Sequence, residues 1–175
     1  MQRRKWMCLA FFGATAATVT AVGVQQAMAT PAVGFVGTQI ALGRLGDINI
    51  LNSMVQAGAP PWLTLEFTKG QSDLYVINNV WQPGGNTGWH SHPGHSLIIV
   101  TSGTLTDYEA SDPNCKPVVY TTGQAFIDPG GDEVHNIRNE TGATATNIAI
   151  QLIPAGATRR IDEPQPGNCP TFPAF

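Results

Sequence analysis

Short hydrophobic segments separated by turn-forming residues follow one another from residue 31 to residue 154. They are rich in β-branched side chains and lack helical periodicity, so each is predicted to form a strand. Pro, Gly, Asn and Asp cluster between the segments, and these residues favour tight turns. The predicted strands are Val33–Ile40, Leu63–Thr68, Leu74–Trp81, Leu97–Thr101, Thr104–Tyr108, Val118–Thr121, Gln124–Ile127, Val134–Arg138 and Ala143–Ile153.

One segment, Gly46–Ala57, instead has the apolar spacing of a short helix, at Ile48, Ile50, Leu51 and Met54. We therefore expect a single helix there. Strands that follow one another this closely indicate a β-sandwich or a β-barrel. The pattern excludes parallel sheets built from alternating strands and helices, and it predicts one all-β domain.

Composition agrees with this fold class. The chain has 175 residues, of which 42% are hydrophobic, enough to bury one core. Its 19 glycines and 13 prolines favour a turn-rich fold over a helical bundle. The net charge is -3, and basic residues cluster only at positions 3–5 and 159–160, so nucleic acid is not an expected partner.

The first 29 residues resemble a secretory signal peptide. Arg3, Arg4 and Lys5 precede an uncharged stretch, Trp6–Val24, and a small-x-small site at Ala27-Met28-Ala29 follows. The alternative is a membrane anchor, but the apolar run contains threonines and glycines and does not end at a charged stop. We expect cleavage after Ala29, no stable membrane span after processing and a secreted or periplasmic location, by either the general or the twin-arginine route.

Removal of residues 1–29 leaves two cysteines, Cys115 and Cys169. Two cysteines in an oxidising compartment usually pair, so we expect a disulfide, with two free thiols or a metal-binding pair as alternatives. The disulfide would tie a proline-rich tail, residues 155–175, to the domain formed by residues 30–154.

All four histidines of the chain lie in two segments flanked by turns. His90 and His92 are two residues apart, so on a strand both imidazoles point from the same face and can reach one metal ion. Such a pair fits a surface or core position equally well. The second segment favours the metal site over a surface or core position, because His135 follows a Pro-Gly-Gly turn and can supply a third imidazole from a neighbouring strand.

These residues form two motifs with a known resemblance. The pattern Gly84-x5-His90-x-His92-x3-Ser96-x6-Gly103 resembles the first motif of the cupin superfamily, and Gly123-x5-Pro129-x-Gly131-x3-His135-x3-Asn139 resembles the second, with one extra residue before His135. The resemblance implies a small single-domain cupin with a double-stranded β-helix, or jelly-roll barrel. It also implies one divalent transition metal ion with His90, His92 and His135 as ligands.

The first motif departs from the family at Ser96, where cupins carry a glutamate ligand. Three neutral histidines favour zinc, iron, nickel or copper over manganese, although the sequence does not decide among these five metals. His95 is a candidate fourth ligand or acid/base group, yet strand alternation from Ser96 points it to the other side. Glu133 is the nearest replacement carboxylate, but it precedes the strand. Asn136, Asn139 or backbone carbonyls would accept hydrogen bonds from the second ring nitrogens.

Three functions fit these features. The first is an exported, metal-dependent oxidoreductase of the dioxygenase type that acts on an unknown small molecule. The second is a metal-dependent isomerase or lyase, and the third is a non-enzymatic protein that binds or stores a small molecule or metal. The run Leu97-Ile98-Ile99-Val100 is apolar on both faces, which predicts a second layer or a dimer partner over it. The resemblance likewise suggests a homodimer.

Overall fold

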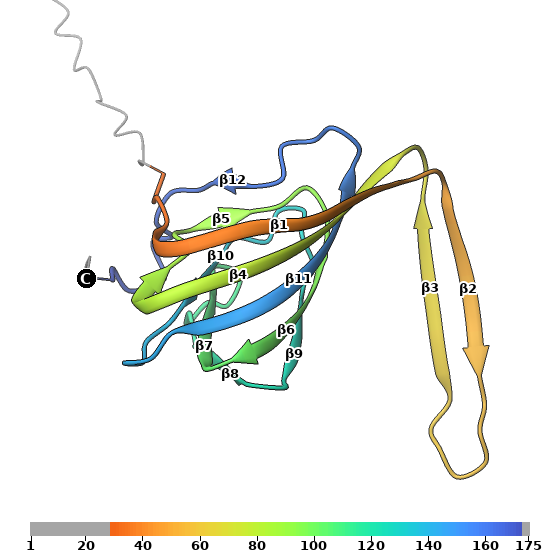
Figure 1. Ribbon diagram of the computed structural model, residues 1–175, viewed down its shortest axis with the longest axis horizontal. Helices are drawn as coiled ribbons and strands as arrows, with labels where there is room; N and C mark the ends of the chain where they lie inside the picture. The colour runs from red at the N-terminus through yellow and green to blue at the C-terminus, as the bar shows by residue number, and fades with distance from the viewer. Residues whose placement is uncertain (1–28, 173–175) are drawn as a thin grey trace, which may run out of the picture.

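A computed structural model describes residues 29–172, and within this range all the regular secondary structure is β-strand (Figure 1). The predicted all-β class is confirmed, and no helix in the described range is long and apolar enough to cross a membrane. The predicted signal segment lies outside the described residues, apart from Ala29. The strands are β1 (Val33–Leu45), β2 (Ile48–Met54), β3 (Trp62–Thr68), β4 (Ser72–Asn86), β5 (His90–Ser91), β6 (Ser96–Ser102), β7 (Thr104–Glu109), β8 (Val118–Thr121), β9 (Ala125–Asp128), β10 (His135–Arg138), β11 (Ala145–Pro154) and β12 (Ile161–Asp162).

Antiparallel pairing joins ten of these strands into one strongly curved sheet. The order along the sheet is β12-β5-β10-β4-β11-β6-β9, while β1 also pairs with β4 and the β7-β8 pair continues from β10. The sheet curls into a nearly closed barrel, as expected for a double-stranded β-helix (Figure 1). Barrel closure brings the short strand β5 against β10, although four strands, β6 to β9, separate them in sequence.

The barrel interior is filled by alternate residues of each strand, because successive side chains of a strand point to opposite faces. The apolar core comprises Trp81, Ile98, Val100, Leu105, Phe126, Ile137, Ala145 and Ala149, all buried. On β11 the inward series continues from Ala149 to Gln151, which is also buried. The interior therefore changes from apolar to polar toward one mouth of the barrel, and the histidines lie at that mouth.

The helix predicted for residues 46–57 is wrong. The segment forms β2, which pairs with β3 from Ile48↔Thr68 to Met54↔Trp62. The apolar residues at positions 50, 51 and 54 imitate helical spacing, but β-branched residues at 48 and 50 and the long complementary run in β3 favour a ladder. Pairing with β3 therefore decides the structure of this segment, and the apolar pattern within the segment alone does not reveal that pairing.

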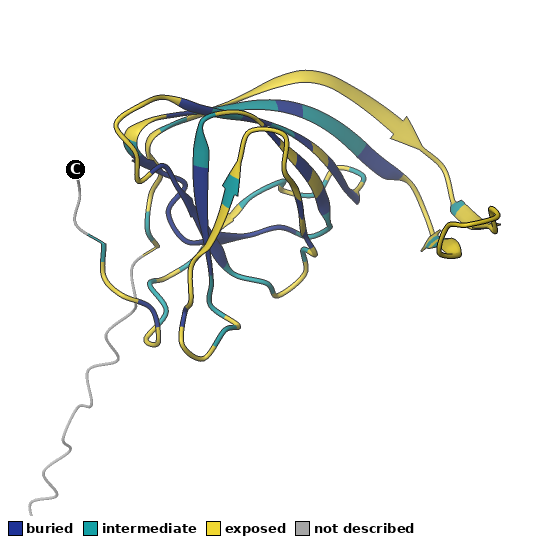
Figure 2. Ribbon diagram, turned by 90° about the horizontal axis from the view of Figure 1, so that it is seen from below, coloured by how far each residue is buried: buried dark blue, intermediate teal, exposed yellow. Residues whose placement is uncertain are grey.

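The β2-β3 hairpin stands apart from the barrel. It extends the paired strands β1 and β4 beyond their end, and Figures 1 and 2 show it projecting from the barrel as an almost fully exposed arm. At its base Lys69 forms an ion pair with Asp47, whose Oδ1 accepts a 2.8 Å hydrogen bond from the Gly70 backbone N–H. These contacts join the two strand ends at the base of the hairpin.

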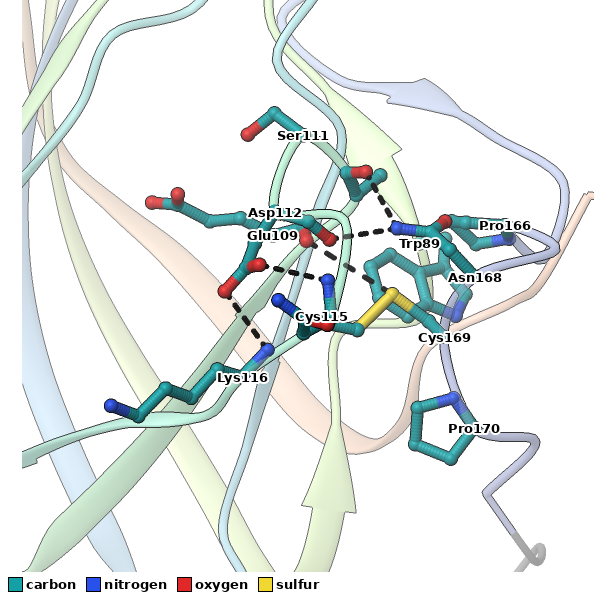
Figure 3. Close-up of a disulfide and its surroundings, with 12 residues drawn as sticks. Trp89, Glu109, Ser111, Asp112, Cys115, Lys116, Pro166, Asn168, Cys169 and Pro170 are labelled. Carbon is teal, nitrogen blue, oxygen red and sulfur yellow. Dashed lines mark hydrogen bonds between the residues drawn. A yellow bond between two sulfur atoms is a disulfide. The ribbon is translucent and has the colours of Figure 1, made fainter.

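The C-terminal tail is held against the barrel by a disulfide between Cys115 and Cys169, with the two Cα atoms 5.1 Å apart (Figure 3). Asn168 donates hydrogen bonds from Nδ2 to the carbonyls of Ala110 and Asp112, at 3.0 and 2.8 Å. Further along the tail, Phe172 contacts the ring of Tyr108 and the guanidinium of Arg138. The disulfide thus closes a second small core beside the barrel.

Candidate metal centre

Three histidines meet at one mouth of the barrel. His90 lies on β5 and pairs directly with His135 on β10, while His92 follows β5 with its ring on the same side. One ring nitrogen from each histidine lies within 4.8 Å of those from the other two, and all three residues are buried. Nitrogens at such separations can share one ion, because zinc–nitrogen bonds are about 2.0–2.1 Å long.

Backbone carbonyls orient two of the three rings. His90 Nδ1 lies 3.0 Å from the carbonyl oxygen of Gly88, and His92 Nδ1 lies 2.6 Å from that of Arg159. Nδ1 then donates its proton to the carbonyl and Nε2 keeps the free lone pair that a metal ligand needs. Of the hydrogen-bond acceptors expected from the sequence, backbone carbonyls are therefore the partners of these two rings. Asn139 instead anchors a turn, donating to the Ala143 carbonyl at 2.7 Å.

Burial keeps these imidazoles neutral. It lowers the pKa of His90 well below its ordinary value, helped by the charge of His135 and Arg160, and it lowers the pKa of His92. It also lowers the pKa of His135 to about 4, against the opposing effect of Asp128. A neutral imidazole is the form that binds a metal, so no proton has to be displaced near neutral pH.

The sequence interpretation missed one residue at this site, Asp128. It ends β9 and lies directly opposite Ser96 in the β6-β9 pairing. Its Oδ2 is 3.7 Å from His92 Nε2, and its Oδ1 is 4.0 Å from His135 Nδ1. A usable signal was present, because alternation from the inward Phe126 points residue 128 into the barrel.

Hydrogen bonds hold the Asp128 carboxylate in place. Ser96 Oγ donates to Oδ2 at 3.1 Å, and the Gly130 backbone N–H donates to Oδ1 at 2.8 Å. Gln151 Nε2 in turn donates to Ser96 Oγ at 3.3 Å. The serine that replaces the cupin glutamate therefore holds a carboxylate that enters the site from the neighbouring strand.

The histidines face a small cavity of about 70 Å³ inside the barrel. Trp81, Phe126 and Ile98 form its apolar part, and Gln151 lies on its polar side. Two cations, Arg159 and Arg160, also line it, and Arg160 Nη2 donates a 2.6 Å hydrogen bond to the Thr87 carbonyl. The cavity therefore combines imidazole nitrogens and a carboxylate with positive charge.

The two other candidates from the sequence lie elsewhere. His95 is on the outside of the barrel, where its Nε2 is 3.9 Å from Glu66 Oε1 of the hairpin, as alternation from Ser96 requires. Glu133 accepts a 2.9 Å hydrogen bond from Ser111 Oγ. Neither side chain belongs to the group of three histidines.

Comparisons with known proteins agree with this architecture. Residues 80–150 match the family model for the Cupin domain (Cupin_2). A comparison with curated proteins found no match. The matched segment runs from β4 to β11 and contains all three buried histidines.

Similar solved structures include a double-stranded β-helix protein from Klebsiella pneumoniae subsp. pneumoniae MGH 78578, with 20% identity over 51% of this chain and 75% of that chain and a TM-score of 0.43. A cupin-like protein from Thermotoga maritima msb8 aligns with 25% identity over 52% of this chain and 65% of that chain, with a TM-score of 0.44. A predicted oxalate decarboxylase from Thermotoga maritima aligns with 20% identity over 49% and 83%, with a TM-score of 0.38. These TM-scores are too low to assign a fold by themselves. The family match covers residues 80–150, contains both histidine motifs and shows a cupin domain in this part of the chain.

Proposed function

We propose that this chain is an exported, metal-dependent oxidoreductase of the dioxygenase type that acts on a small molecule. The observation that carries the proposal is the buried group of His90, His92 and His135, whose ligand atoms lie within 4.8 Å of one another. Imidazole nitrogens suit iron, copper, nickel and zinc, and manganese is the remaining candidate. A redox-active metal bound there would supply the activation of molecular oxygen, while three histidine ligands leave coordination positions open.

Asp128 is the fourth protein donor in this proposal. Its carboxylate lies beside His92 and His135 and is held by Ser96. Cross-strand register puts residues 96 and 128 at the same level of the barrel. In this proposal β9 supplies, through Asp128, the carboxylate that the family carries at the position of Ser96 on β6. The negative charge of Asp128 then offsets the charge of a divalent cation.

The cavity favours a small substrate with an anionic group. Its volume is about 70 Å³, and Arg159 and Arg160 are cations on its lining. Arg160 is held by the Thr87 carbonyl and by Asp162 Oδ1, at 2.6 and 2.7 Å, so its position is fixed before a substrate arrives. Preorganised charge of this kind orients a carboxylate or enolate at low entropic cost.

Export is the second part of the proposal. The disulfide between Cys115 and Cys169 supports it, because disulfides persist in oxidising compartments such as the periplasm and the extracellular space. N-terminal sequencing of the protein recovered from the exported fraction of its own host is expected to begin at Thr30. A chain that retains its first residues in the cytoplasm would contradict export.

A metal-dependent isomerase or lyase is the second candidate, and Asp128 is the observation that favours it. A buried carboxylate 3.7 Å from a ligand nitrogen can also serve as a general base toward a substrate bound at the metal. The two roles differ in one measurable way. Asp128→Asn should weaken metal binding if the carboxylate is a ligand, and should leave binding intact while abolishing turnover if it is a base.

Metal analysis and oxygen uptake test the proposed function. We expect protein purified after export from its own host to contain iron, copper, nickel or manganese, and to consume oxygen with members of a panel of small enols, thiols and flavonols. His90→Ala and His135→Ala should both lose the metal. A protein that contains only redox-inert zinc and consumes no oxygen would contradict the oxidoreductase, and metal retained in either variant would contradict the ligand assignment.

A further inference from the structure

A row of polar side chains crosses the barrel interior beside the candidate metal centre. In the register of the sheet, Tyr75 on β4 lies opposite Gln151 on β11, and Gln151 lies opposite Ser96 on β6. Ser96 in turn lies opposite Asp128 on β9. The four strands are neighbours in the sheet (Figure 1). Opposite side chains on neighbouring strands have Cβ atoms about 4.5–5.5 Å apart, so the row is continuous, with Gln151 near its centre.

The hydrogen bonds of this row fix the orientation of the Gln151 amide. The Asp128 carboxylate only accepts hydrogen bonds, so the Ser96 hydroxyl donates its single proton to this group, at 3.1 Å. Ser96 Oγ is then the acceptor toward Gln151, whose Nε2 donates to it at 3.3 Å. The amide nitrogen of Gln151 therefore faces Ser96, and the amide oxygen, Oε1, is left as a free acceptor.

Gln151 Oε1 is a buried acceptor without a donor. Gln151 is 2% exposed, and its Oε1 has no hydrogen-bond partner among the described residues. An unpaired polar atom in the interior carries a desolvation cost, and native proteins contain few of them. Gln151 also lines the internal cavity of about 70 Å³. A ligand in this cavity that donates a hydrogen bond to Oε1 would offset the cost.

Positive charge lies beside the same row. Arg159 and Arg160 line the cavity, and the guanidinium carbon of Arg159 is 6.0 Å from the ring centroid of Tyr75, the cross-strand neighbour of Gln151. The backbone of Arg159 is held at the histidines, because its carbonyl accepts the 2.6 Å hydrogen bond from His92 Nδ1. One small cavity thus offers both an anion-binding group and an unpaired hydrogen-bond acceptor.

We propose that this cavity binds a small 2-hydroxy acid, with its carboxylate held by Arg159 and Arg160 and its hydroxyl donating a hydrogen bond to Gln151 Oε1. The inference rests on the proposed function in taking this cavity as the substrate site, and it names the substrate class. A cavity of about 70 Å³ holds roughly five water-sized groups, which limits the acid to the size of glycolate or lactate. A carboxylic acid without the hydroxyl would leave the Gln151 acceptor unpaired. Gln151 is therefore the residue that selects the hydroxy acid.

Glycolate and propionate test this assignment, because they have the same size and charge and differ in a hydroxyl against a methyl group. Isothermal titration calorimetry uses the protein purified after export from its own host, with its metal content as isolated. We expect glycolate to bind roughly 10-fold or more tightly than propionate. Gln151→Leu removes the acceptor and keeps a side chain of similar size. It should lower the preference for glycolate roughly 10-fold, with the affinity for propionate unchanged or raised.

Two further variants separate recognition from folding. Ser96→Ala removes the hydroxyl that orients the Gln151 amide, so the amide is free to turn and part of the preference should be lost. Thr146→Val is the matched control, since it makes a polar residue apolar on the same strand, where the Thr146 hydroxyl bonds that of Thr101 on the outside of the barrel. It should leave both affinities unchanged. Near-ultraviolet circular dichroism and metal analysis of each variant report that the barrel and its metal content are retained.

A crystal structure of the wild-type protein with glycolate tests the contact directly, even if Gln151→Leu fails to fold. The glycolate hydroxyl is expected within about 3.2 Å of Gln151 Oε1. A water on Oε1 with the acid bound elsewhere would overturn the proposal. So would equal affinities of the wild type for the two acids, binding of neither acid, or a preference that Gln151→Leu retains, because the hydroxyl would then be recognised by another group such as the metal.

The outcomes for this proposal and for the proposed oxidoreductase are distinguishable. Acid binding is measured without oxygen, so a protein that prefers glycolate but consumes no oxygen would retain the hydroxy-acid site and lose the oxidoreductase. A protein that consumes oxygen with another substrate and does not distinguish glycolate from propionate would retain the oxidoreductase and lose the role of Gln151.

Discussion

At the scale of single residues, Asp128 lies opposite the motif position at which this chain departs from the cupin pattern. Ser96 occupies the position of the cupin glutamate and donates its hydroxyl proton to Asp128 at 3.1 Å. Strand alternation identifies residue 128 as inward, but the pairing of 96 with 128 depends on how β6 and β9 meet. The sequence therefore predicts the three histidines, whereas the carboxylate is found only once the register is known.

Asp128→Asn is expected to weaken metal binding about 10- to 100-fold, because the amide keeps the size of the carboxylate but loses its charge. Competition titration against a chromogenic chelator, with zinc and cobalt, measures the change. Ser96→Ala is the matched variant and should have a smaller effect, since it removes one hydrogen bond to the carboxylate. Equal affinities for wild type and Asp128→Asn would show that the carboxylate is not a ligand.

Asp107 is a second buried carboxyl group inside the barrel. Burial, with Glu109 and Asp128 nearby, raises its pKa to about 8, and its Oδ1 has no hydrogen-bond partner. Between about pH 4 and pH 8 the unfolded chain has lost this proton while the folded chain retains it. The folded state binds more protons, so this group lowers the free energy of unfolding as the pH rises through that window.

Asp107→Asn is therefore expected to stabilise the protein at pH 8 by about 2 kcal/mol or more, and to have little effect near pH 4. Thermal unfolding followed at several pH values measures the difference from wild type. The control is Asp132→Asn in an exposed turn, which removes one carboxyl group outside the barrel. A difference for Asp107→Asn that does not change with pH would contradict the buried neutral carboxyl.

At the scale of elements, local patterns predict strands that belong to the barrel and fail at the arm. Segments such as 118–121 and 97–101 are short, rich in β-branched residues and bounded by turns, and both form strands close to the predicted bounds. Segment 46–57 has apolar residues on both faces, so no period distinguishes a helix from a strand there. Its pairing with β3 decides that the segment is a strand.

The tail is the element whose position the sequence predicts best. Cys115 and Cys169 are bonded, and the loop they close spans 54 residues. Chain entropy alone then stabilises the folded state by about 4 kcal/mol. Trp89, immediately before His90, donates a 2.8 Å hydrogen bond from its indole to Gln165 of the tail. The tail thus supports the segment that contains His90 and His92.

Replacing both cysteines, as Cys115→Ala with Cys169→Ala, is expected to lower the free energy of unfolding by about 2–4 kcal/mol, because the unfolded chain is no longer constrained. Urea denaturation followed by tryptophan fluorescence measures this change. Treatment of the wild-type protein with a reductant should reproduce it. If reduction leaves the denaturation midpoint unchanged, the tail is held by its hydrogen bonds and ring contacts rather than by the disulfide.

At the scale of the whole molecule, the three histidines lie where the short strands β5 and β10 meet. β5 is two residues long and pairs with β10 through the single register position His135↔His90. The two motifs predict the three histidines as metal ligands, but only barrel closure brings residue 135 to residues 90 and 92. An ion shared by these side chains would act as a cross-link between the two strands.

Metal binding is therefore expected to stabilise the entire fold. A ligand present at 1,000 times its dissociation constant adds about 4 kcal/mol to the free energy of unfolding, which corresponds to roughly 10 °C in a domain of this size. Differential scanning calorimetry of metal-free protein, before and after addition of zinc or iron(II), measures the shift. His90→Ala and His135→Ala should abolish it, because each removes one ring of the buried group. His95→Ala is the matched control, since this histidine lies outside the barrel beside Glu66, and it should retain the full shift. An equal loss in all three variants would mean that the stabilising ion binds on the surface rather than within the barrel.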